Sequence, residues 1–365
     1  MFSYYGAQFG CNPKYITNYI INHYPKDTFD LVWAFNDPAL KGNSDHFRKV
    51  KTMSLRYFYE LCTAKVVITN FRTTDLFVKR KEQYYIQTWH SSLRLKQIEK
   101  DAASVLPASY VQMAKKDSLK CDLLLSGCHF STNIFARSFW YKGEIFKHGT
   151  PRNDILLQVN SQMRKEILKK LKIPSDTKIL LYAPTFREND SSSVYHLNYS
   201  KLIEKLTSTF SGKWVVLVKL HPHFISQASV ITNRDDVLNV TTYDDIQELL
   251  AVADVLITDY SSLMFDYSLT NRPCFLYVPD LKDYTTKERK LYFNLIELPF
   301  ICATSNDDLL VKMDQYKSEQ YKKEVKDFLS DIGSYENGKA SKNLLKRIEE
   351  VCFDEGRDDE TYEAV

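Results

Sequence analysis

Short apolar runs and amphipathic segments alternate along the first part of the 365-residue chain. An apolar run of about four to eight residues is typical of a strand buried on both faces, and apolar residues at every third or fourth position indicate a helix. Asn12 and Pro13 have the residue types of a helix cap and a first helical position. These patterns predict strands at 28–35, 65–70, 82–90 and 120–127, and helices at 12–24, 54–64 and 132–141.

The alternation restarts in the second half of the chain. An amphipathic helix is predicted at 160–173, followed by strands at 178–186, 213–223, 236–242, 254–259 and 274–279 with helical segments between them. Strands that alternate with helices predict parallel sheets covered on both faces. We therefore expect an α/β protein with one α/β domain over 1–150, a second over 151–345, and an acidic tail over 346–365.

Composition is that of a globular protein, with 44% hydrophobic and 26% charged residues. The chain contains no apolar run of about 18 residues, and its first residues lack the pattern of a signal peptide, so neither a transmembrane helix nor a secretory leader is expected. Seven scattered cysteines without a CxxC pair predict reduced thiols and a cytoplasmic protein.

Charge is distributed unevenly between the two halves. Residues 1–150 carry 21 basic and 12 acidic residues, and the remainder carries 28 basic and 34 acidic ones. A basic first half suits an anionic membrane surface, an acidic polymer or nucleic acid, although an ordinary solvated surface explains it equally well. No motif of the usual nucleic-acid-binding modules is present, which makes a nucleic-acid partner the weakest of these alternatives.

The chemically distinctive residues follow predicted strands. In open α/β sheets, ligands bind at the carboxyl ends of strands. Polar residues occupy these ends at His90, at Thr185 and Arg187, at His221 and His223, and at Asp259, Ser261 and Ser262. Their clustering predicts one binding site shared by several strands.

Each of these motifs has a functional and a structural interpretation. The HPH sequence with His221 and His223 suits phosphate, because Lys219 precedes it, but it also suits loop packing or a metal. Ser261 or Ser262 at a helix start offers an anion site, or simply a helix cap. Arg187 matches a phosphate, or it pairs with Glu188 at the surface.

Further positions remain open in the same way. Asp266 lies one helical turn after Ser262, where it would face either a ribose diol or solvent. Arg152 belongs to the turn-rich sequence HGTPRND at the expected domain boundary. The chain lacks GxxxxGK[ST], GxGxxG and GxSxG, which argues against nucleoside triphosphatases, dinucleotide dehydrogenases and serine hydrolases.

Taken in order, WHSSLRLK, HGTPRND, YAPTFR, KLHPH and TDYSSLMFDYSLTNRPCFLYVPD resemble the motifs of the CDP-glycerol glycerophosphotransferase family of teichoic-acid and capsule polymerases. The resemblance extends to about residue 340. It implies two Rossmann-like domains facing a cleft, as in GT-B glycosyltransferases, with the acceptor bound by the first domain and CDP-glycerol by the second. It also implies transfer of glycerol phosphate to an acceptor hydroxyl with release of CMP, by a peripheral protein at the inner face of the membrane.

The resemblance assigns roles to individual residues. His90 matches the histidine that deprotonates the acceptor hydroxyl, and Asp259 and Asp266 match an acid that fixes a loop and a ribose contact. Arg152 matches the arginine of the crossover motif. The positions matching donor-phosphate contacts are Thr185, Arg187, His221, His223, Ser261 and Ser262.

One departure from the family pattern concerns the acceptor side. Ser91 follows His90 where the family usually has glycine, which narrows the expected acceptor site. A CDP-ribitol or nucleotide-sugar transferase, a nucleotide-sugar epimerase and a catalytically silent polymer-binding protein remain alternatives. No tightly bound cofactor is expected; the acceptor is a lipid-linked or polymeric hydroxyl, and the need for a divalent metal stays open.

Overall fold

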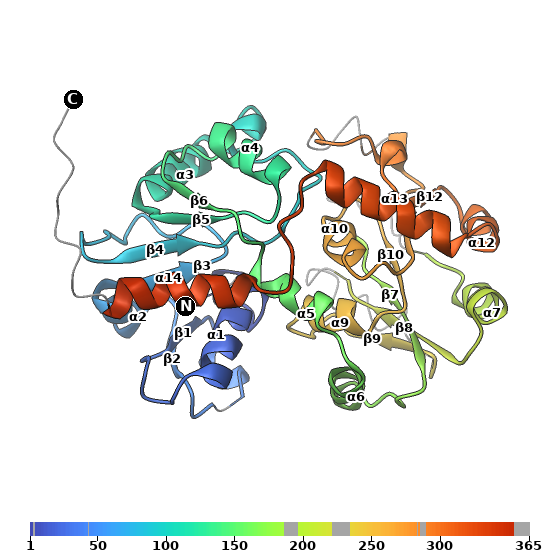
Figure 1. Cartoon of the computed structure of the whole chain (residues 1–365), viewed down its shortest axis with the longest axis horizontal. Coiled ribbons are helices and arrows are strands. Elements are labelled where there is room, and N and C mark those ends of the chain that lie inside the picture. The colour runs from blue at the N-terminus through green and yellow to red at the C-terminus, as the bar shows by residue number, and fades with distance from the viewer. Residues whose placement is uncertain are drawn as a thin grey trace.

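Two α/β lobes lie side by side in the computed structural model (Figure 1). The structure describes residues 1–2, 4–42, 44–185, 196–220, 234–282, 284 and 290–353. Each lobe is built on a parallel sheet, which confirms the α/β class that the alternation of strands and helices predicted. Within the described residues, no helix combines the length and the apolar character needed to cross a membrane.

The first lobe contains a four-stranded sheet and a separate pair of strands. The sheet has the order β3-β4-β5-β6, and β1 pairs with β2. Phe2 links them, because its N–H donates to Ile68 O at 3.2 Å while Ala34 N–H donates to Met1 O at 3.1 Å. The strands are β1 (Val32–Phe35), β2 (Arg48–Lys51), β3 (Val66–Thr69), β4 (Tyr84–Gln87), β5 (Leu123–Leu125) and β6 (Glu144–Phe146).

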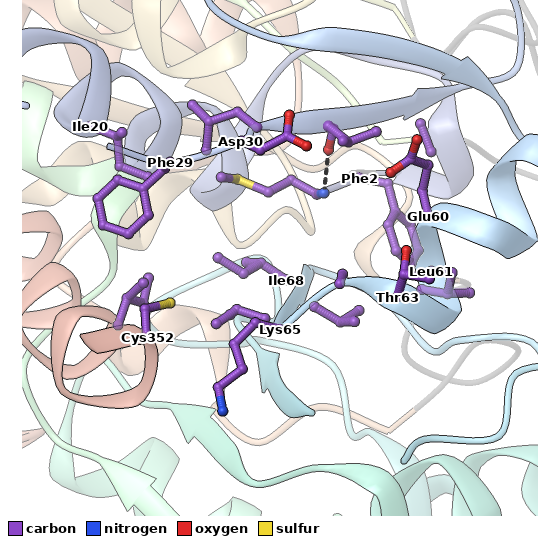
Figure 2. A pocket seen from close by; sticks show the side chains of 18 of the residues that line it. Phe2, Ile20, Phe29, Asp30, Glu60, Leu61, Thr63, Lys65, Ile68 and Cys352 are labelled. Carbon is purple, nitrogen blue, oxygen red and sulfur yellow. Dashed lines mark hydrogen bonds between the residues drawn. The ribbon is translucent and has the colours of Figure 1, made fainter. Parts of the chain in front are cut away.

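A cavity of about 390 Å³ lies where β1, β3 and the end of the last helix meet. Figure 2 shows its largely apolar lining, including Ile20, Phe29 and Cys352. Two runs of its lining, 28–32 and 63–66, lie directly before or at the start of β1 and β3. The cavity therefore lies toward the amino ends of these strands, whereas ligands of α/β sheets bind at the carboxyl ends.

The helices predicted at 12–24 and 54–64 are confirmed to within one residue, and the one predicted at 132–141 lies three residues earlier in the chain. Ser54 caps α2 by accepting Tyr57 N–H at 3.2 Å. The predicted cap at Asn12 is wrong, because α1 already begins at Cys11 and the Asn12 side chain points to other partners. The helices are α1 (Cys11–His23), α2 (Leu55–Thr63), α3 (Ala108–Lys120) and α4 (His129–Ser138), with short 3-10 turns at Tyr4–Gly6, Pro38–Leu40 and Glu99–Ala102.

The second lobe has a six-stranded parallel sheet of order β12-β11-β10-β7-β8-β9. The strands β7 and β10 are neighbours in space but not in sequence, so the winding of the sheet reverses between them. In such sheets this reversal marks the ligand crevice. The strands are β7 (Lys178–Tyr182), β8 (Trp214–Val218), β9 (Val237–Asn239), β10 (Val255–Thr258), β11 (Cys274–Tyr277) and β12 (Ile301–Ala303).

Helices cover both faces of this sheet (Figure 1). The amphipathic segment predicted at 160–173 forms α6, which Asn160 caps by accepting Met163 N–H at 2.9 Å. The helices are α5 (Asp154–Leu157), α6 (Ser161–Lys170), α7 (Tyr199–Phe210), α9 (Ile246–Val252), α10 (Leu263–Ser268), α12 (Asn306–Asp314) and α13 (Ser318–Asp331), with 3-10 turns at Pro151–Asn153 and Leu295–Glu297.

The last helix, α14 (Ala340–Phe353), returns to the first lobe (Figure 1). Leu344 and Ile348 are buried in the same core cluster as Ile16 and Ile20 of α1. The expected boundary at residue 345 falls inside this helix, because its apolar stripe continues through the acidic sequence that suggested a tail. The chain therefore crosses between the lobes twice, near residues 148–154 and near residues 332–340.

Candidate active site between the lobes

His90 follows β4 at the carboxyl edge of the first sheet, as predicted. Trp89 adopts a left-handed backbone conformation (φ 49°), and its ring stacks against that of His90 at 4.7 Å. His90 Nδ1 lies 3.4 Å from Asn70 O. Burial, reinforced by the positive charges of Arg152 and Arg94, lowers the pKa of His90 to about 3, so the imidazole is neutral at pH 7.

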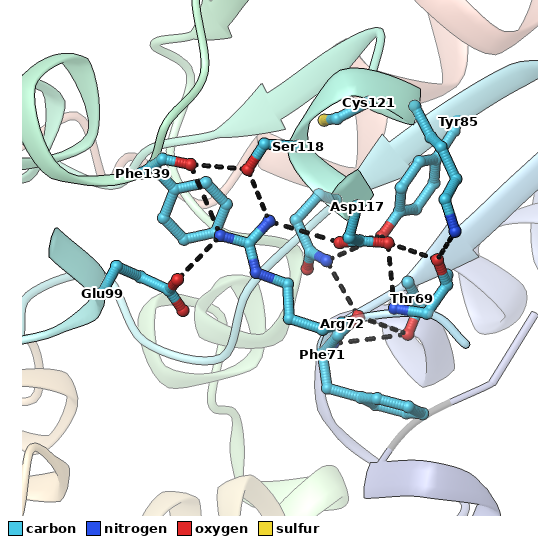
Figure 3. A network of polar contacts seen from close by, with 12 residues as sticks. Thr69, Phe71, Arg72, Tyr85, Glu99, Asp117, Ser118, Cys121 and Phe139 are labelled. Atoms are coloured by element: carbon cyan, nitrogen blue, oxygen red, sulfur yellow. Dashed lines mark hydrogen bonds and ion pairs between the residues drawn. The ribbon is translucent and has the colours of Figure 1, made fainter. Parts of the chain in front are cut away.

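A buried ionic network lies beside Trp89, the residue before His90, and sequence patterns gave no sign of it. Arg72 lies between Glu99 at 3.0 Å and Asp117 at 3.2 Å, with all three side chains almost fully buried (Figure 3). Asp117 also accepts Thr73 N–H at 3.0 Å. The network thus fixes the segment that begins at Asn70, whose carbonyl faces His90.

The crossover sequence HGTPRND joins residues from both lobes. The Arg152 guanidinium donates to Asp266 of α10, and its backbone N–H donates to Asn12 Oδ1 at 2.9 Å. Asn153 Nδ2 donates to the other Asp266 oxygen at 3.1 Å. Because Asp266 is fully buried and both of its oxygens have partners, it orients Arg152 in this structure; its contact with a ribose stays a prediction.

Asp259 and Thr185 meet where the winding of the second sheet reverses. The Asp259 carboxylate accepts Thr185 N–H at 2.9 and 3.1 Å. Thr258 Oγ1 donates to Ala183 O at 2.7 Å, which further joins the ends of β7 and β10. The carboxylate therefore fixes the start of the segment that follows β7.

The two serines before α10 have separate partners. Ser261 Oγ accepts Leu263 N–H at 3.3 Å, although the N-cap position of α10 is Ser262, whose hydroxyl caps no N–H of that helix. Ser262 Oγ accepts the N–H of Leu95, a residue of the first lobe, at 3.3 Å. The contact continues as Gln97 N–H donates to Lys290 O at 2.8 Å, so the segment after His90 pairs with the second lobe.

Glu336, in the second crossing segment, is a further charged group at this junction. Its Oε1 accepts hydrogen bonds from the Thr150 hydroxyl at 2.7 Å and from the Asn153 side-chain amide at 3.2 Å. Burial, with a smaller contribution from the Asp266 charge, raises its pKa to about 7 despite hydrogen bonds that favour the carboxylate. Sequence analysis missed this residue because the polar sequence SYENGK has no pattern that distinguishes it from a surface turn.

The structure thus brings together two groups of predicted residues. One group surrounds Arg152 of the crossover sequence and consists of His90, Arg152 and Asp266. The other group lies at the ends of β7 and β10 and consists of Thr185, Asp259, Ser261 and Ser262. Arg187, His221 and His223 lie outside the described residues. Within the described part of the chain, no group of three histidine, cysteine or acidic side chains is placed to hold a metal ion.

The family model and the similar proteins all point to the same family. The model of the CDP-Glycerol:Poly(glycerophosphate) glycerophosphotransferase family matches residues 1–350. The chain is 33% identical to the teichoic acid poly(glycerol phosphate) polymerase of Staphylococcus epidermidis over 94% of its own length, but it spans only about half (49%) of that relative. It is 31% identical to the teichoic acid glycerol-phosphate transferase of Staphylococcus aureus, with 95% of this chain and 91% of the relative covered.

Solved structures agree with the sequence comparison. The wall teichoic acid polymerase TagF superposes with a TM-score of 0.84 and 31% identity, covering 96% of this chain and 87% of that one. A variant of that polymerase soaked with CDPG superposes with a TM-score of 0.84. A family match over nearly the whole chain, together with this shared two-lobed architecture, places the chain among the enzymes of the CDP-glycerol:poly(glycerophosphate) glycerophosphotransferase family.

Proposed function

We propose that this enzyme transfers glycerol phosphate from CDP-glycerol to a hydroxyl of a teichoic acid acceptor and releases CMP. Family membership supports the reaction, and the CDPG-soaked relative supports the donor. The observation that carries the proposal is a neutral histidine, His90, held at a strand end beside Arg152 where the two lobes meet.

His90 is the proposed general base. A proton on Nδ1 directed at Asn70 O leaves Nε2 with a free lone pair, which is the form required to accept a proton. The nearby Arg152 and Arg94 lower the pKa of this ring. A bound diphosphate would offset that positive charge and raise the basicity of His90 when the donor is in place.

The donor would lie against the second lobe, at the reversal between β7 and β10. Asp259 would keep Thr185 in position, and Asp266 would orient Arg152 or contact the ribose. Hydroxyl, guanidinium and imidazole donors suit the oxygens of a diphosphate. The proposed donor-phosphate contacts are Thr185, Arg187, His221, His223, Ser261 and Ser262.

The reaction is a displacement at phosphorus. The acceptor oxygen bonds to the phosphorus that bears glycerol, and the bond from that phosphorus to the bridging oxygen breaks. The bonding electrons leave with CMP, while the proton of the acceptor hydroxyl moves to His90 Nε2. Positioning and stabilisation of the leaving negative charge dominate catalysis of this kind.

We also propose that the enzyme works at the cytoplasmic face of the membrane, with the basic first half facing anionic lipid. Co-sedimentation with vesicles should increase with their phosphatidylglycerol content and decrease with salt. Equal binding to neutral vesicles would contradict this placement.

The decisive experiment measures CMP release from CDP-glycerol with and without a glycerol-phosphate-primed acceptor. His90→Ala should lose about 10²- to 10⁴-fold in turnover, while calorimetry should show nearly unchanged affinity for CDP-glycerol. His23→Ala, at the exposed end of α1, is the matched control. Absence of acceptor-dependent CMP release in the wild type would refute the activity; wild-type turnover in His90→Ala would refute only the base assignment.

A further inference from the structure

Glu336 occupies a segment that is pinned to the first lobe. Tyr335 N–H donates to Gly127 O at 2.9 Å, and His129 N–H donates to Gly333 O at 2.8 Å. These backbone bonds hold the second crossing segment against the end of β5 and the start of α4. The backbone that carries Glu336 is therefore held against the first lobe by the bonds at Gly333 and Tyr335.

The Glu336 carboxyl group joins three segments of the site. It accepts the N–H and hydroxyl of Thr150 and the amide of Asn153, which flank Arg152 in the crossover sequence. The Ser92 hydroxyl, two residues after His90, lies next to the same carboxylate, because a Cβ at Gly127 would lie within 2.7 Å of both groups. One carboxylate thus connects the segment carrying His90 with the segment carrying Arg152.

Two glycines leave the space that this carboxyl group fills. A Cβ at Gly127 would lie 2.7 Å from Glu336 Oε1 and 2.2 Å from Ser92 Oγ. A Cβ at Gly149 would lie 2.8 Å from Glu336 Oε2, and Gly149 also has a left-handed φ of +86°. Side chains at either position would displace the carboxylate, so the backbone is built around it.

We propose that Glu336 is a positioning residue for glycerol-phosphate transfer, whose carboxylate holds the His90 and Arg152 segments in their productive arrangement. The inference rests on the proposed function. Glu336 acts through Ser92, Thr150 and Asn153 rather than by contact with the reacting atoms. A neutral side chain at this position loses an acceptor for the Thr150 N–H and loosens the alignment of His90 with the donor.

Burial, with a smaller contribution from the Asp266 charge, makes the protonation of Glu336 relevant at neutral pH, and three groups surround it. Asp266 faces it from α10, Cys128 from the start of α4, and Arg152 lies between its two crossover partners. The pKa of about 7 means that acidification below neutrality converts an acceptor into a proton donor. The rate of transfer should therefore decrease on the acidic side of pH 7.

The test compares wild type, Glu336→Gln and the exposed control Glu324→Gln in pH profiles of CMP release. We expect Glu336→Gln to lower kcat by about 10- to 100-fold, with a smaller change in the KM for CDP-glycerol and without the acidic limb near pH 7. Wild-type kcat and an unchanged acidic limb in this variant would overturn the inference. A wild type without any CMP release would instead refute the proposed function.

A second variant keeps the inference testable if Glu336→Gln folds poorly. Thr150→Val removes the hydroxyl that donates to Glu336 at 2.7 Å and retains the backbone N–H. Loss of a hydrogen bond to the carboxylate raises the pKa of Glu336 further, so the acidic limb should move to higher pH. A limb that stays in place would show that it belongs to another group.

Discussion

Ser261 and Ser262 are adjacent, yet their hydroxyl groups differ in what they can offer a ligand. Ser261 Oγ accepts an N–H at the start of its own helix, whereas Ser262 Oγ accepts an N–H from Leu95 in the other lobe. The Ser261 bond lies within one segment, so it does not depend on the position of the lobes. The Ser262 hydroxyl changes partners if the segment containing Leu95 moves, which makes it the serine whose contact with a donor phosphate depends on lobe position.

The neutral state of His90 should be visible in the pH dependence of stability. Its pKa is depressed from the ordinary 6.5 to about 3, so between these values the unfolded chain binds a proton that the folded protein does not. Stability contributed by this group is therefore present above pH 6.5 and is lost as pH falls toward 3, by at most about 1.4 kcal/mol per pH unit. Urea unfolding of wild type and His90→Asn between pH 4 and 7.5 measures the part of the unfolding free energy that depends on the protonation of His90.

The difference between the two proteins is the relevant quantity, because Glu336 acts in the opposite direction. Its raised pKa makes the folded protein bind the extra proton between about pH 4.5 and 7. His90→Asn should therefore lose less stability on acidification than the wild type does. Parallel curves would contradict a neutral imidazole at His90 in the folded protein.

At the scale of elements, the crossover sequence bonds to several other segments, among them α1 through Asn12. Thr150 bonds to the second crossing segment, Arg152 bonds to α10, and Asn153 accepts Gln247 Nε2 of α9 at 2.7 Å. Asp154 accepts the N–H groups of Ala340 and Ser341 at 2.9 and 2.8 Å, which caps α14. A short turn-rich sequence thereby fixes the helix that returns the chain to the first lobe.

Removal of that cap should loosen α14. Asp154→Ala leaves two backbone N–H groups at the helix start without their carboxylate, at a cost of about 1–2 kcal/mol. Hydrogen exchange of the α14 amides should become faster, and the urea midpoint should fall. Asp327→Ala, on the exposed face of α13, is the control and should leave both unchanged. Unaltered exchange in α14 would contradict the capping role.

The buried strands could be predicted, because β7, β8, β10 and β11 are continuous apolar runs. The edge strands β2, β6 and β12 could not, since at most one residue of each is fully buried and their sequences resemble loops. His90 and Asp259 were found because strand ends reveal the ligand edge of a sheet. Asn12 and Glu336 reach the site only through tertiary folding, and buried charges such as Arg72 look like surface charges in a sequence.

At the scale of the whole molecule, an ionic cluster joins the lobes on the side of α1. Lys14 Nζ lies 2.6 Å from Asp245 and 2.7 Å from Glu248, and Tyr15 donates to the same Asp245 oxygen at 2.8 Å. Lys14 and Asp245 are both buried. The Lys14 ammonium group of the first lobe thus forms a buried ion pair with two carboxylates of the second lobe, which helps to hold the lobes together.

Lys14→Met should weaken this joint. It leaves the Asp245 and Glu248 carboxylates buried without their cation, which should cost about 3 kcal/mol of unfolding free energy, and small-angle scattering should show a larger radius of gyration. Lys346→Met, exposed on α14, is the matched control. An unchanged radius together with an unchanged unfolding midpoint would show that other contacts hold the lobes.

The double crossing of the chain limits how the lobes can move. If each lobe is rigid, two connections between the lobes allow one lobe to rotate only about the line that joins the two connections. The two connections are also bonded to each other beside the candidate site, because Thr150 on one donates a hydrogen bond to Glu336 on the other. Points near such an axis are displaced least. A rotation of one lobe about this line would therefore separate the far ends of the lobes, while the groups beside the crossover sequence keep their alignment.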